Sequence, residues 1–184
     1  MRSLLRPTAV PRAVIAASLA TAALAGTSVL TAAPASALSY KCATSTKSLD
    51  TPEMNGPWAD NWDIKIKMCS ARSGSTVYSK AIATWDGPVT ERGWPFFNKA
   101  ALTIWIAKSV SGTDPKVRTG TYTGIEAQLE KSDSWGNYNG SYTTPTISYR
   151  VGSTKAYADS QLKLDWRNDG RDYLKYGYTA SPKV

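Results

Sequence analysis

The sequence contains no histidine, and this absence excludes several kinds of active site. Histidine is the usual general base near neutral pH, a common metal ligand and the base of Ser-His and Cys-His nucleophile pairs. The chain also lacks a G-x-S-x-G turn and any glycine-rich phosphate-binding loop. We therefore expect no catalytic residue of these kinds, no metal site and no cofactor.

Long uncharged apolar runs are also lacking, except for one near the N-terminus. The run 13–33 follows three arginines, is rich in Ala, Thr and Leu, and ends shortly before Ala35-Ser36-Ala37. A basic start, an apolar run and an A-x-A site are typical of a secretory signal peptide. A membrane anchor is the alternative, because the run is long enough to span a bilayer. We expect residues 1–37 to be cleaved, and the mature chain to be secreted without a membrane span.

The predicted mature chain, residues 38–184, has 147 of the 184 residues, the size of a single domain. The signal carries three of the 22 basic residues and none of the 14 acidic ones, so the net charge falls from +8 to +5. The basic residues are scattered rather than clustered, which argues against nucleic-acid binding. A moderate positive charge suits attraction to an anionic cell-wall polymer or another polysaccharide surface. The oligomeric state stays open.

Cysteine is scarce, with only Cys42 and Cys69. An exported chain meets oxidising conditions, so the two are expected to form one disulfide. In the chain-entropy model, closing a loop of this length stabilises the fold by about 3 to 4 kcal/mol.

Alternating apolar and polar residues dominate the rest of the chain. In 61–69, Trp62, Ile64, Ile66 and Met68 occupy one face and charged residues the other, the period of a half-buried strand. Asn168-Asp169-Gly170 is a strong hairpin signal. No sustained helical period is present. These patterns predict an all-β fold, a single antiparallel β-sandwich or alternatively a small barrel. About eight strands are predicted, at 40–44, 61–70, 76–85, 99–108, 117–131, 142–151, 157–167 and 172–179.

Carboxylates are the remaining route to catalysis, since a glycosidase needs only two at a suitable separation. Glu126 and Glu130, on one face of the predicted strand 117–131, would lie about 13 Å apart at about 3.3 Å per residue, too far for either glycosidase geometry. Glu91, Asp159 and Asp165 stay open as members of pairs between strands.

The seven tryptophans divide into two groups. Four fall in strand patterns, where core packing explains them: Trp62, Trp85, Trp105 and Trp166. Trp58, Trp94 and Trp135 lie in turn-like segments, where burial is not required. The segment 134–142, SWGNYNGSY, adds amides and two more aromatic rings to Trp135.

The sequence thus favours a secreted, non-catalytic domain that binds a glycan, a cell-wall polymer or another extracellular surface. The candidate ligand-binding residues are Trp135, Asn137, Tyr138, Tyr142, Trp94 and Trp58. Rings that merely cover the ends of the sandwich are the structural alternative. An inhibitor of a protease or other enzyme, presenting the irregular segment 49–60, is a second hypothesis, and a carboxylate-based hydrolase is a third.

Overall fold

The computed structural model describes residues 38–52 and 61–184. The predicted signal peptide 1–37, Trp58 and most of the segment 49–60 lie outside the described residues, so these predictions stay predictions. In the described part, no helix is long and apolar enough to cross a membrane.

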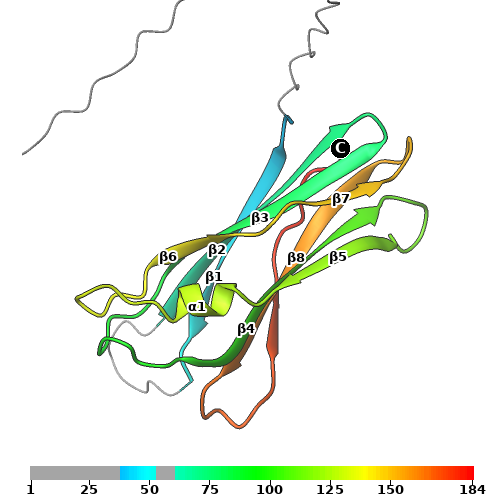
Figure 1. The fold of residues 1–184 in the computed structure, drawn as a ribbon. Coiled ribbons are helices and arrows are strands. Elements are labelled where there is room, and N and C mark those ends of the chain that lie inside the picture. Colours follow the sequence, from blue (N-terminus) through cyan, green and yellow to red (C-terminus); the bar gives the residue numbers. More distant parts are fainter. Residues whose placement is uncertain (1–37, 53–60) are drawn as a thin grey trace, which may run out of the picture. The chain divides into compact units, whose positions relative to one another are not determined.

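Nine strands and one short helix make up the described chain (Figure 1). In order they are β1 (Lys41–Asp50), β2 (Asn61–Ser73), β3 (Thr76–Asp86), β4 (Phe97–Lys108), β5 (Lys116–Tyr122), α1 (Ile125–Leu129), β6 (Gly140–Thr143), β7 (Ile147–Arg150), β8 (Ala156–Trp166) and β9 (Leu174–Gly177).

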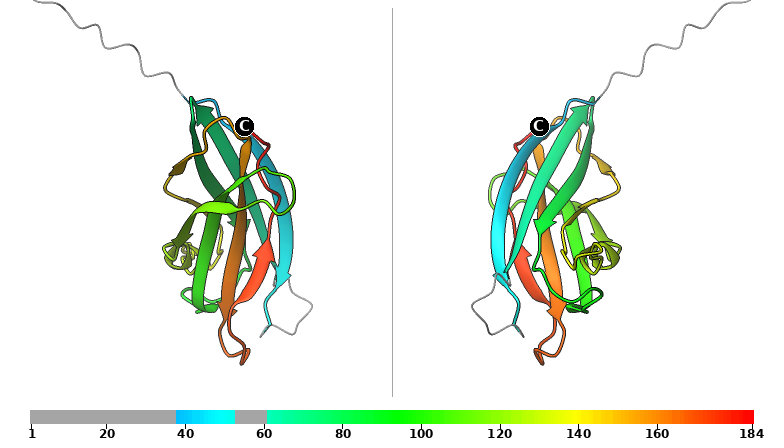
Figure 2. Two further views of the ribbon diagram at one scale, coloured as in Figure 1. Left: turned by 90° about the vertical axis from the view of Figure 1, so that its right-hand side faces the viewer. Right: turned by 90° about the vertical axis from the view of Figure 1, so that its left-hand side faces the viewer.

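The strands form two antiparallel sheets, and the predicted β-sandwich is confirmed. The first sheet has the order β1-β2-β3-β6, with β7 also paired to β3, and the second has the order β5-β4-β8-β9. Figure 2 shows the strands of both sheets running along the same long direction. The chain crosses from one sheet to the other between β3 and β4, β5 and β6, and β7 and β8.

The period-two pattern correctly identified the inward faces. Trp62, Ile64, Ile66 and Met68 of β2 are fully buried, and Leu102 and Ile104 of β4 oppose them from the second sheet. The small outward residues of β4 are buried as well. The Lys116 ammonium lies over the Trp105 ring, 3.7 Å from the ring centroid. Both β2 and β4 lie between two neighbouring strands in their sheets.

The predicted disulfide is present. Cys42 and Cys69 face each other in the β1–β2 register, with an S–S distance of 2.06 Å. The bond fixes the N-terminal edge strand to the centre of its sheet.

Two predicted strands were wrong in part. The segment 117–131 is strand β5 followed by helix α1, because Ile125 and Leu129 are four apart and a helix buries both on one face as well as a strand would. The segment 142–151 runs along β3 as two strands, β6 and β7, because the pairing is interrupted at residues 144–146. Pro145 in this interruption has no N–H to donate to a ladder. The first strand is longer than expected and extends to Asp50.

Candidate functional site

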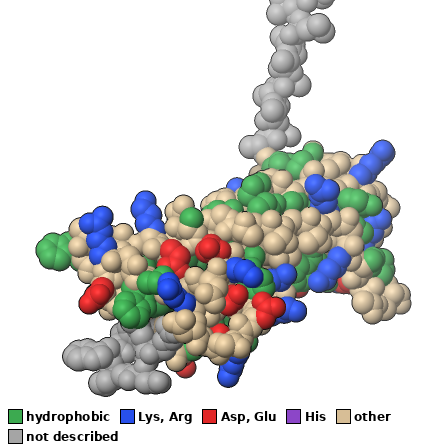
Figure 3. All heavy atoms as spheres, turned by 60° about the horizontal axis from the view of Figure 1, so that its bottom comes forward, with side chains coloured by type: hydrophobic (Ala, Val, Ile, Leu, Met, Phe, Trp, Pro, Cys, Tyr) green, Lys and Arg blue, Asp and Glu red, His purple; other side chains and the backbone are tan. Residues whose placement is uncertain are grey.

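Two loops, 87–96 and 131–139, meet at one end of the sandwich; together with the β8–β9 turn, 167–173, we call this the loop end. Thr90 N–H donates to Gly136 O at 3.0 Å, and Val89 forms an isolated bridge with Asn137. Figure 3 turns this end of the sandwich forward and shows hydrophobic side chains at the surface among basic and acidic ones. Backbone contacts therefore hold the two loops in register with each other.

Asp133 fixes the turn that carries Trp135. Its Oδ1 accepts hydrogen bonds from the backbone N–H groups of Trp135 (2.7 Å) and Asn137 (3.0 Å), and its Oδ2 accepts from Asn137 Nδ2 (2.8 Å). These bonds, led by that of the Asn137 side chain, lower the pKa of Asp133 below its ordinary value. The carboxylate is therefore ionised at neutral pH and acts as the organising acceptor of the turn.

Gly136 is required for the two loops to approach each other. Its φ is +80°, and a Cβ atom at this position would lie 1.8 Å from Thr90 O. Any other residue would have to push the loops apart.

Tyr138, predicted as a ligand contact, is instead a core residue. Its ring is fully buried and lies edge-on to Phe96 at 4.8 Å between centroids. Its hydroxyl donates to Trp94 O at 2.9 Å, which ties the first loop to the second. This residue can position the surface but does not belong to it.

The other predicted contacts in 134–142 also have structural partners. Asn137 is engaged with Asp133. Asn139, which was not among the predicted contacts, accepts from Gly87 N–H through its Oδ1 at 3.0 Å. Tyr142 lies opposite Ala83 and packs partly buried against the core.

Trp94 and Trp135 are the predicted residues that the loop end does expose. Trp135 is 83% exposed and Trp94 is 39% exposed, and Val89 of the first loop is 66% exposed. Only two further large hydrophobic side chains of the described residues are exposed, Val110 and Tyr149. The exposed apolar groups therefore concentrate on the two joined loops.

A polar hollow of about 270 Å³ adjoins the Trp135 turn. Its side chains offer amide, hydroxyl, ammonium and carboxylate groups, which suit hydrogen bonding to a polyhydroxylated ligand. The lining residues are Gln128, Lys131, Ser132, Asp133, Asn139, Gly140 and Ser141.

The expected 13 Å separation of Glu126 and Glu130 was wrong, because Glu126 lies in α1 and Glu130 caps its C-terminus, one helical turn further on. Glu126 accepts a hydrogen bond from Ala100 N–H, and Glu130 accepts from Phe96 and Phe97 N–H. These N–H groups lie before the point at which β5 begins to pair with β4. The two carboxylates thus take the place of a strand along the start of β4.

Burial raises the pKa of Glu130 despite the hydrogen bonds that it accepts. The neighbouring Glu126 acts in the same direction. Because both carboxylates are engaged by backbone donors, a structural role accounts for them.

The other candidate carboxylates are not brought together as a pair on β8. Asp159 lies opposite Trp105, whereas Asp165 lies opposite Lys99, six residues further along the strand, or about 20 Å. Asp165 is buried and accepts from Asn98 Nδ2 at 3.1 Å. Glu91 is exposed on the first loop. Among the residues 38–52 and 61–184, no group of three or more potential metal ligands is found.

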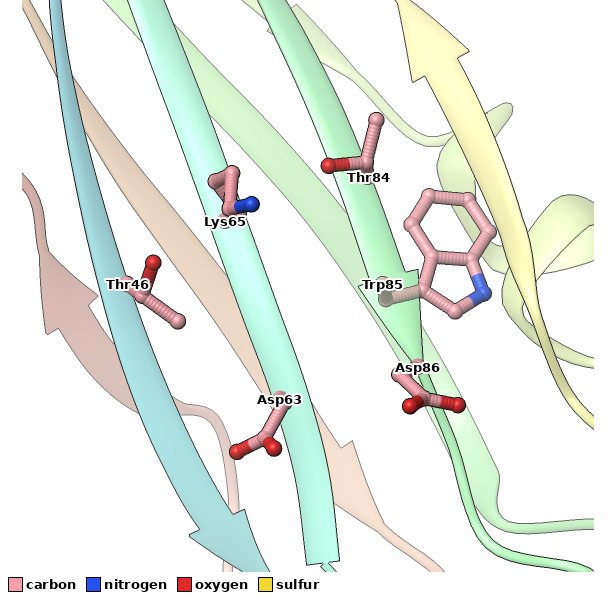
Figure 4. A pocket seen from close by; sticks show the side chains of 6 residues that line it. All are labelled: Thr46, Asp63, Lys65, Thr84, Trp85 and Asp86. Atoms are coloured by element: carbon pink, nitrogen blue, oxygen red, sulfur yellow. The ribbon is translucent and has the colours of Figure 1, made fainter.

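Another hollow, of about 410 Å³, lies on the outer face of the first sheet (Figure 4). Thr46, Lys65 and Thr84 form one cross-strand row, and Asp63 and Asp86 lie opposite each other in the next. No exposed aromatic ring lines it, since Trp85 is 5% exposed. This hollow has the character of a solvated polar sheet face.

Sequence reasoning missed two residues that shape the loop end. An aspartate can accept a hydrogen bond from the backbone two residues on, here Trp135 N–H, and so hold a turn; Asp133 could have been found from this signal. Arg167 could not, because its place beside Trp94 depends on the packing of the β8–β9 turn against the first loop.

The chain matches no protein-family model, no curated protein and no solved structure.

Proposed function

We propose that this chain is an exported, non-catalytic domain that binds a polysaccharide through Trp135 and Trp94 at the loop end. The proposal combines the signal-peptide pattern in 1–37 with the exposed aromatic rings on loops of defined geometry.

The exposure of Trp135 is the observation that carries the proposal. Burying a large aromatic side chain stabilises a fold by about 2 to 3 kcal/mol, and here that gain is given up. The turn itself is not loose, because Asp133 and the Thr90–Gly136 contact fix it. A rigid turn that exposes a flat apolar ring is suited to stacking on the C–H face of a sugar.

The polar hollow beside Trp135 supplies the complementary interactions. A sugar ring that stacks on the indole would turn its hydroxyl groups toward neighbouring amide and hydroxyl side chains, such as those of Gln128, Asn139 and Ser141. Binding sites of this kind combine an apolar surface with a few placed polar groups.

A pull-down on insoluble polysaccharides and isolated cell walls tests the proposal. We expect the wild-type protein to be retained on at least one of them and Trp135→Ala to lose at least tenfold in affinity. Tyr149→Ala is the matched control, because Tyr149 is also exposed (38%) but lies on β7, paired with the turn end of β3. Equal retention of wild type and Trp135→Ala, or retention on none of the polymers, would contradict the proposal.

A further inference from the structure

A second hollow at the loop end, of about 260 Å³, lies where the first loop meets the β8–β9 turn. It is lined by Trp94, Pro95, Arg167 and Asn168. Arg167 N–H donates to Phe96 O at 2.9 Å, which fixes the turn against the loop. Asn168 follows in the left-handed conformation, with φ at 59°. The hollow is therefore built from two segments joined by a backbone hydrogen bond.

The two halves of this hollow differ in chemistry. Trp94 and Pro95 contribute apolar rings, of which Trp94 is 39% exposed. Arg167 contributes an exposed guanidinium that has no hydrogen bond or ion pair with any described residue. Arg72, in contrast, uses its guanidinium on the carbonyl oxygens of Gly152, Thr154 and Val184.

The carboxylate of Glu130 does not satisfy Arg167. Glu130 acts on it only through space, because its carboxylate oxygens accept from Phe96 and Phe97 N–H. The planar guanidinium of Arg167 can therefore donate its N–H groups to a ligand. Its fork of N–H donors matches the two oxygens of a carboxylate.

We propose that the Trp94–Arg167 hollow is a subsite for a carboxylate-bearing sugar, so that the ligand is an acidic polysaccharide. The sugar ring packs on Trp94 and Pro95, and its carboxylate accepts hydrogen bonds from Arg167. The amide of Asn168 lies beside the same group. This inference rests on the proposed function and gives it a ligand class; the positive net charge acts in the same direction at longer range.

Polygalacturonate and its methyl ester are the probes, because they share the sugar ring and differ in charge. In titration calorimetry at about 0.15 M salt, we expect the wild-type protein to bind the acid at least tenfold more tightly than the ester. Arg167→Gln should lower the affinity for the acid by roughly tenfold or more and leave the ester unchanged. Arg167→Lys should recover only part of the loss, because a single ammonium cannot form the fork.

Lys65→Gln is the matched control, since it removes the same charge from the outer sheet face in Figure 4. It should change the affinity for the acid by less than twofold. Equal losses in Arg167→Gln and Lys65→Gln would overturn the inference, because general attraction to a polyanion would then explain the binding. Melting curves of both variants establish that each is folded.

The inference and the proposed function fail in different ways. Binding to neutral polymers that depends on Trp135 but shows no preference for the acid would overturn the acidic subsite and leave the proposed function in place. Absence of binding to all of the polymers would overturn both.

Discussion

The tryptophans between the sheets and those on the loops are the same residue in opposite environments. Trp62 and Trp166 are 0% and 1% exposed, whereas Trp94 and Trp135 are 39% and 83% exposed. Trp62 contacts three aromatic rings, those of Phe96, Phe97 and Tyr138. No ring contact of Trp135 with another described residue is found, although its backbone is fixed by Asp133. The buried indoles thus stabilise the core, whereas the indoles at the loop end are accessible to a ligand.

Polar groups divide in the same way. Along the start of β4, Glu126 and Glu130 accept hydrogen bonds from backbone N–H groups. At the loop end, the guanidinium of Arg167 has no such partner among the described residues. A binding surface requires hydrogen-bonding groups without a partner in the chain beside exposed rings. The difference between the core and the loop end can be tested one residue at a time.

Trp62→Ala should give the largest loss of stability. It removes an indole at the centre of the aromatic cluster and leaves a cavity between the sheets, which costs about 3 to 5 kcal/mol. Chemical denaturation followed by circular dichroism measures the change. A loss below about 1 kcal/mol would show that the cluster does not support the fold as described.

Glu130→Ala should come next, with a loss of about 1 to 3 kcal/mol. The substitution leaves the N–H groups of the buried residues Phe96 and Phe97 without their acceptor. Glu130→Gln keeps an acceptor oxygen and should lose less, so equal losses in the two variants would count against this role.

The same position should make stability depend on pH. Burial raises the pKa of Glu130 in the folded state, so its contribution is complete at low pH and is lost as pH rises through the folded-state pKa. The free energy of unfolding of wild type relative to Glu130→Gln should therefore decrease as pH rises above the ordinary glutamate pKa of about 4.3. Parallel curves for the two proteins would contradict the shift.

Most of the sandwich could be predicted because a period of two assigns each strand residue to a face. β2, β3 and β8 follow this rule, and the β8–β9 hairpin follows from residues that tolerate positive φ, Asn168 and Gly170. Helix α1 was missed because a spacing of four residues is common to both periods. The error mattered, since it separated two glutamates that in fact share one helical turn.

The candidate site could be predicted only in part. Turn-like surroundings singled out Trp94 and Trp135 as residues that need not be buried, and both are exposed. They could not show which ring of the segment 134–142 enters the core, because Tyr138 is buried by residues of β2 and of the first loop. Local sequence specifies a turn, but long-range packing decides which of its side chains point inward.

Gly136→Ala should also lower stability measurably, by about 1 to 3 kcal/mol, because the new Cβ would meet Thr90 O. Gly152→Ala is the matched control: its φ is +68°, and no atom lies within 4 Å of the added Cβ. The difference between the two variants isolates the contact between the loops. Thermal melts that shift equally would indicate that the φ angle alone, and not the contact, limits this position.

Trp135→Ala should have the smallest effect on stability, within about 0.5 kcal/mol of wild type. The ring is 83% exposed, so its removal leaves no cavity, and the backbone N–H of residue 135 still donates to Asp133. Chemical denaturation of Trp135→Ala and Trp62→Ala under the same conditions compares the loss in free energy of unfolding for an exposed and a buried tryptophan. A loss above about 1 kcal/mol would mean that the ring packs against the chain. Its exposure would then no longer need a ligand to explain it, and the proposed function would lose the observation on which it depends.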